Sequence, residues 1–139
     1  MFSVEIDRSK RLLVITAAGH ISREEVKEAA EQVREKLREV APGLRALIDF
    51  RWLDSIRPSA APHIAEIMEL LAEKEVASVV RIIPNAGKDI AMNILSRFRY
   101  SDDLPITTVS TLVEALDRLL DHNAECERKG PAHTMGRKR

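Results

Sequence analysis

Carboxylates and hydroxyl groups gather between residues 49 and 59. Asp49 ends a short apolar run, Asp54 and Ser55 follow, and Ser59 precedes a segment with helical periodicity. Carboxylates at the carboxyl edge of a sheet can hold a metal ion or assist phosphoryl transfer. A site of that kind also needs an acidic pair after the first strand, and residues 15–18 supply none. We therefore expect Asp49 to accept backbone amides at a strand end, and we predict no metal and no cofactor.

Two serines of this segment have alternative roles. Ser59 stands where a helix cap belongs, and as a cap it would contribute about 1 kcal/mol by satisfying a free amide. As a phosphorylation site it would carry roughly 1.5 to 2 negative charges at a helix N-terminus, with Arg51 and Arg57 as partners. The pattern favours the cap; phosphorylation of Ser59 is the alternative, and Ser55 is the weaker candidate site.

Trp52 is the only tryptophan of the chain and lies in the same segment. Two roles fit: a cover over the core, which is the favoured interpretation, or an anchor for a partner, because Trp and Arg dominate interface hot spots. The second role defines a predicted partner-binding surface that consists of Arg51, Trp52, Asp54, Arg57 and Ser59.

Three apolar side chains suggest a different kind of site. Met68, Met92 and Phe98 could line a pocket between helices and sheet, although core packing is the favoured interpretation. A pocket of this kind would hold a small apolar or lipid-like ligand.

Side chains for nucleophilic catalysis are scattered. The four histidines fall in different predicted elements, without the spacing of metal ligands and without an evident Ser or Cys to activate. Cys126 is the only cysteine, which excludes an internal disulfide and a thiolate cluster. We therefore predict that the protein is not an enzyme.

Hydrophobic periodicity predicts the order β-β-α-β-α-β-α-β-α. The predicted strands cover about residues 2–7, 11–16, 44–49, 77–83 and 106–109, and the predicted helices about 23–40, 62–73, 88–98 and 112–120. An antiparallel hairpin comes first, and a helix follows each remaining strand. The fold class is therefore α/β, with a mostly parallel five-stranded sheet and four helices in a single domain.

Local signals mark two helix starts. Ser22 with Glu25, and Thr111 with Glu114, form capping boxes. In the last helix we expect five apolar residues to face inward: Leu112, Ala115, Leu116, Leu119 and Leu120.

Composition limits the class of protein. With 45% apolar and 32% charged residues, the 139-residue chain is typical of a soluble globular protein, and its zero formal charge argues against nucleic-acid binding. We predict a domain over 1–122 and a flexible basic tail over 123–139. Without an apolar run of roughly 20 residues or a signal peptide, the expected location is the cytoplasm.

The order of elements over residues 2–121 resembles the STAS domain (sulfate transporter and anti-sigma factor antagonist), closest to the STAS/SEC14-like group of small bacterial proteins. The best local match, 47–50 (Leu-Ile-Asp-Phe), is similar to the strand before the family's regulatory loop. The family's regulatory Ser or Thr lies in an Asp-Ser-Ser/Thr-Gly turn. Here 53–56 (Leu-Asp-Ser-Ile) keeps an Asp-Ser pair earlier and without the Gly, and 57–59 (Arg-Pro-Ser) stands at the turn.

The resemblance implies a non-catalytic regulatory module that binds a protein partner, such as a kinase-like anti-sigma protein, through a loop over 49–59 and the following helix. The alternative is a carrier of a small apolar ligand. The oligomeric state stays open, a homodimer included.

Overall fold

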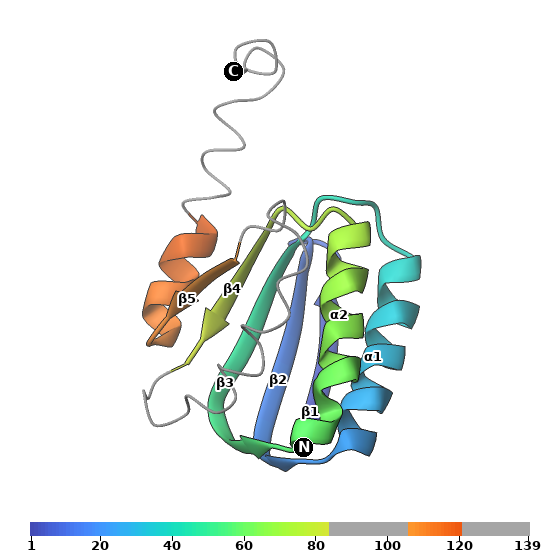
Figure 1. Cartoon of the computed structure of the whole chain (residues 1–139). Helices are drawn as coiled ribbons and strands as arrows, with labels where there is room; N and C mark the ends of the chain where they lie inside the picture. The colour runs from blue at the N-terminus through green and yellow to red at the C-terminus, as the bar shows by residue number, and fades with distance from the viewer. Residues whose placement is uncertain (84–105, 121–139) are drawn as a thin grey trace, which may run out of the picture.

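The computed structural model describes residues 1–83 and 106–120, which form an α/β domain around a mixed five-stranded sheet (Figure 1). The strands are β1 (Phe2–Asp7), β2 (Leu12–Ile21), β3 (Arg45–Ile56), β4 (Ser78–Ile82) and β5 (Ile106–Val109). They lie in the order β1-β2-β3-β4-β5, with β3 in the centre. The β1–β2 pair is antiparallel and the other three pairs are parallel, which confirms the predicted sheet.

Helices cover both faces of the sheet. On the first face lie α1 (Arg23–Arg38) and α2 (Ala61–Glu73), with the short 3-10 helix η1 (Pro58–Ala60) before α2 (Figure 1). A helix over residues 112–120 packs against the second face. The described residues thus form three α-helices instead of the four predicted, and the predicted helix over 88–98 lies outside them.

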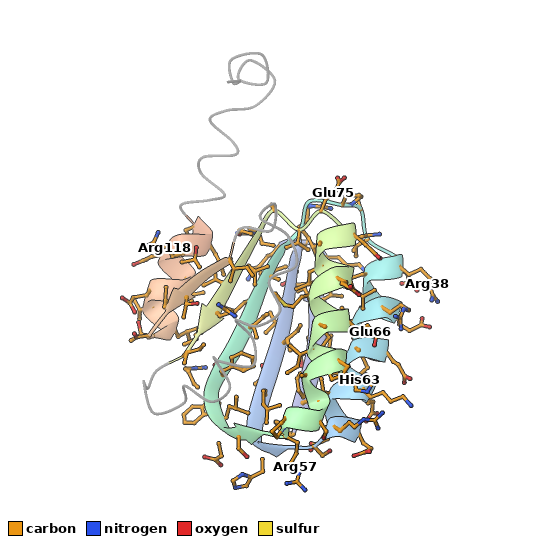
Figure 2. All side chains as sticks on the ribbon, in the orientation of Figure 1. Arg38, Arg57, His63, Glu66, Glu75 and Arg118 are labelled. Atoms are coloured by element: carbon orange, nitrogen blue, oxygen red, sulfur yellow. The ribbon has the colours of Figure 1, made fainter. Side chains whose placement is uncertain are left out.

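The main core lies between the first face and the α1–α2 pair. Alternate residues of β2 and β3 point into it, because side chains alternate between the two faces of a strand. The large side chains that the two strands contribute are Leu13, Ile15, Ile21, Ile48, Phe50, Leu53 and Ile56. An ion pair between Arg34 of α1 and Glu66 of α2 joins the two helices at the surface, with His63 beside it (Figure 2).

A smaller core lies on the second face, where Leu47, Val80 and Ile82 meet Ala115 and Leu119. The prediction that Leu116 and Leu120 also face inward is wrong, since these side chains are 46% and 64% exposed. A helix that touches the sheet on one side buries only a limited arc, and the five residues named in the prediction span too wide an arc.

Both predicted capping boxes are confirmed. The Glu25 amide donates to the Ser22 hydroxyl over 3.1 Å, and the Ser22 amide donates to the Glu25 carboxylate over 2.9 Å. Thr111 and Glu114 exchange the same two hydrogen bonds, each 3.1 Å long. In the described part of the chain, no helix is long and apolar enough to cross a membrane.

Candidate functional site

The segment predicted as a loop over 49–59 is mostly strand. β3 continues to Ile56, and its second half pairs with the end of β2, from Ala18–Trp52 to Ile21–Ile56. Two register shifts interrupt this pairing, and such bulges place an extra residue in one strand. The loop prediction is therefore wrong, because the bulges break the alternation by which a strand is recognised.

Asp49 is the buried polar group of this segment, with 6% of its surface exposed. Its Oδ1 accepts hydrogen bonds from the Arg51 backbone amide (2.9 Å) and from Arg51 Nε (3.0 Å), and its Oδ2 accepts from Nη2 (2.8 Å). Burial alone would raise the pKa of Asp49, but the hydrogen bonds and charge of Arg51 outweigh it and hold that pKa below its ordinary value. The expected hydrogen bond from a backbone amide is confirmed, but Asp49 lies inside β3 instead of at a strand end, and it also forms an ion pair with Arg51.

Arg51 links this buried carboxylate to an exposed aromatic ring. The guanidinium carbon lies 5.4 Å from the centre of the Trp52 ring, within the range of a cation–π contact. Trp52 itself is 62% exposed. The prediction that Trp52 covers the core is therefore wrong, and the ring is held at the surface by a side chain that is itself anchored to Asp49.

A second polar pair lies next to this trio. His20 Nδ1 and the Ser55 hydroxyl are 2.8 Å apart, in register across β2 and β3. This pairing of a histidine with a hydroxyl was not predicted, because 35 residues separate the two and no local pattern connects them. The described residues contain no cluster of His, Cys, Asp or Glu that could hold a metal ion.

The remaining residues of the predicted surface lie at the end of β3 and in η1. Arg57 and Ser59 are exposed, and Arg57 projects from the edge of the molecule where β3 leads into η1 (Figure 2). Ala60, not Ser59, occupies the N-cap position of α2, and no side chain caps that helix. The prediction of a capping Ser59 is therefore wrong. Asp54 is exposed in the second half of β3, close in sequence to Trp52.

The predicted apolar pocket is only partly within the described residues. Met68 is buried in α2, whereas Met92 and Phe98 lie outside the described ranges. Met68 borders a cavity of about 30 Å³ between α2 and the sheet, whose lining is entirely apolar: Phe2, Ile15, Ile48, Phe50, Ile56, Ile64, Ile67 and Met68.

Comparison with solved structures identifies the fold. The chain is similar to the anti-sigma factor antagonist SpoIIAA in its unphosphorylated form, with a TM-score of 0.62 and 17% identity over 86% of this chain and 98% of that one. SpoIIAA from Bacillus also matches in its phosphorylated form, with a TM-score of 0.51 and 16% identity over 86% and 99% of the two chains.

An uncharacterised DUF3478 protein with a SpoIIAA-like fold from Shewanella loihica gives a TM-score of 0.60 and 23% identity over 85% and 93% of the two chains. No family model and no curated protein matches the chain. The fold is thus that of a STAS-like domain, as the resemblance in sequence implied.

Proposed function

We propose that the protein is a non-catalytic regulatory module that binds a protein partner through the second half of β3, η1 and the first turn of α2. The observation that carries this proposal is the exposed Trp52 ring, held by Arg51 against the buried Asp49. A tryptophan at the surface is an unfavourable exposure of apolar area unless another molecule covers it. The cation–π contact with Arg51 favours one placement of the ring, which reduces the side-chain entropy lost on binding.

The fold supports the same proposal. The solved proteins that resemble this chain include proteins described as anti-sigma factor antagonists, a name that denotes a regulatory role. The partner that we propose is accordingly a regulatory protein, with a kinase-like anti-sigma protein as the first candidate.

We further propose that phosphorylation of Ser59 or Ser55 controls this binding. Both serines are exposed, and the similar protein SpoIIAA has a phosphorylated form. A phosphate would add roughly 1.5 to 2 negative charges beside the cation of Arg57 or the ring of His20. The charge would change the surface that Trp52 presents, so it would act on partner affinity without a change of fold.

The test is capture of partners from the host's own lysate on the immobilised full-length protein. We expect a specific protein to bind the unmodified chain and to be lost with Trp52→Ala. Glu31→Ala, an exposed change on α1, is the matched control and retains the partner. Capture that is indifferent to Trp52→Ala would refute the proposal.

Phosphorylation has its own measurement. Phosphopeptide analysis of the protein purified from its host should find phosphate on Ser59 or Ser55. Ser59→Asp should then weaken capture of the partner, while Ser59→Ala preserves it. Absence of phosphate on both serines under all growth conditions would remove this part of the proposal and leave partner binding intact.

The apolar cavity favours a second function, that of a carrier for a small apolar ligand. Its lining has no polar side chain, but about 30 Å³ accommodates only a few water-sized groups, so a larger ligand must displace side chains of α2. Native mass spectrometry of the purified protein tests it: a bound lipid that Met68→Trp excludes would support the carrier, and a bare protein mass would refute it.

A further inference from the structure

The second face of the sheet carries apolar side chains that no described element covers fully. Leu12 and Val14 of β2 belong to the smaller core but remain half-buried. Residues paired across neighbouring strands share a face, so the β1 partners of Leu12 and Val14, which are Asp7 and Glu5, lie on this face as well. An apolar row on β2 is thus bordered by acidic residues on β1.

The helix over 112–120 adds a second apolar row. Val113 is 69% exposed, and Leu116 and Leu120 are the exposed residues described above. Each of the three directly follows a residue that packs toward the sheet, namely Leu112, Ala115 or Leu119. Successive side chains of an α-helix are rotated by about 100° around the helix axis. The exposed row therefore lies on one flank of the helix, beside the part that touches the sheet.

The direction of this flank follows from Arg118 and from the course of the helix. The Arg45 side chain donates to the Leu119 carbonyl over 3.0 Å, so the helix ends near the start of β3 and runs opposite to the parallel strands. In a right-handed helix with that course, the exposed row turns toward β2. Arg118, about half a turn away from the row, lies on the outer side (Figure 2). The apolar rows of β2 and of the helix thus face a common space.

Carboxylates lie beside both apolar rows of this surface. Glu5 on β1 and Asp117 on the helix are exposed at its two borders. Two cations on the same face are engaged within the molecule: Arg45 donates to the carbonyls of Leu119 and Lys10, and Arg51 is paired with Asp49. A molecule that covers the apolar rows therefore meets carboxylates at the borders.

We propose that this surface, formed by Leu12, Val14, Val113, Leu116 and Leu120, binds an amphipathic basic helix of a partner protein. The apolar side of such a helix covers the two rows, and its Lys or Arg residues pair with Glu5 and Asp117. A second copy of the chain fits less well, because a two-fold contact brings the same acidic borders together. The surface is separate from the one centred on Trp52, and the inference does not rest on the proposed function.

The test uses an 18-residue fluorescent peptide with Leu at helical a and d positions and Lys elsewhere, titrated with the full-length protein. We expect binding that weakens with added salt, since exposed charges are screened. Leu116→Arg should weaken it at least about tenfold, and Val113→Arg is a second variant at another exposed position. Trp52→Ala and Glu31→Ala should leave the affinity within about twofold.

Three results would overturn the inference. The first is that a matched peptide with Glu in place of Lys binds as tightly. The second is that Leu116→Arg and Val113→Arg, both shown to be folded by circular dichroism, bind the Lys peptide with the affinity of the unmodified protein. The third is that sedimentation equilibrium shows a dimer that Leu116→Arg dissociates. The last result makes a second copy the occupant. Loss of partner capture with Trp52→Ala but not with Leu116→Arg distinguishes this surface from the proposed regulatory one.

Discussion

The two halves of β3 belong to one strand and have opposite roles. Residues 45–49 pair with β2 on one side and β4 on the other, and most of their side chains are buried. Residues 50–56 pair with β2, whereas the β4 pairing stops at Asp49. In this second half, Phe50, Leu53 and Ile56 are buried, and two more exposed residues lie between each of them and the next.

The difference in pairing between the two halves explains why part of the central strand is exposed. The first half is fixed by neighbours on both sides and by cores on both faces. In the second half, only the side chains that point to the first face are buried in the core. Its other side chains, Trp52 among them, lie at the surface. Asp49 stands at the boundary, and its ion pair with Arg51 ties the surface half to the core half.

The largest expected effects test whether both halves are equally anchored. Ile48→Ala and Leu53→Ala each remove a buried side chain, one from each half. We expect each to lower the free energy of unfolding by about 2 to 5 kcal/mol, measured by urea denaturation. If Leu53→Ala costs far less than Ile48→Ala, the core does not hold the second half of β3 as it holds the first half.

The next effect concerns the boundary. Arg51→Ala leaves the buried Asp49 carboxylate without its guanidinium partner, and we expect a loss of about 1 to 3 kcal/mol near neutral pH.

This loss should depend on pH. With Arg51 present, the folded-state pKa of Asp49 lies below its ordinary value of 3.8, so the ion pair stabilises the protein above that pH and is lost as the pH falls through the folded pKa. In the variant the backbone amide of residue 51 still donates to Asp49, but the hydrogen bonds and the charge of the guanidinium are gone, so the folded-state pKa of Asp49 is higher than in the unmodified protein. Urea denaturation from about pH 7 to about pH 3 should show the difference in stability shrinking. A constant difference would mean that packing, not charge, accounts for the loss.

A smaller effect concerns the β2 strand that supports the second half. Gly19 lies at a register shift between β2 and β3 with a φ of 75°. Gly19→Ala should cost about 1 kcal/mol because a side chain disfavours this left-handed backbone. Gly19→Asn should cost less, since Asn adopts this conformation more readily. Thermal unfolding of the two variants measures the order, and equal losses would point to a cause other than backbone conformation.

The smallest effect is expected at the most conspicuous residue. Trp52→Ala should change the free energy of unfolding by less than about 0.5 kcal/mol, because its ring is largely in water. Urea denaturation followed by circular dichroism measures the change, since the variant lacks tryptophan fluorescence. A loss above about 1.5 kcal/mol would show that Trp52 supports the fold instead of serving a partner.

Local signals in the sequence were enough for most of the fold. The alternation in β1, the capping residues Ser22 and Thr111, and the unbroken apolar run of the first half of β3 each depend on neighbours a few residues away. The second half of β3 was missed for a physical reason. Two bulges space its buried residues, Phe50, Leu53 and Ile56, three positions apart, and that spacing does not predict a strand.

The candidate site was predicted in part. Its residues, Arg51, Trp52 and Arg57 among them, were identified by type and position. For Trp52 the favoured prediction was burial, and it failed because burial depends on what packs above a strand and not on the strand itself. The contact of His20 with Ser55 joins two strands whose register no local pattern specifies.

The sequence by itself determined the order of the elements, the antiparallel hairpin, the parallel remainder and the two capping boxes, since these follow from periodicity and capping within single segments. Only the tertiary structure decided that Trp52 is exposed, that Asp49 binds Arg51, and that Val113, Leu116 and Leu120 lie beside an apolar row of β2. Exposure and cross-strand contacts depend on pairs of segments that are distant in the chain. The periodicity of one segment does not specify which other segment packs against it.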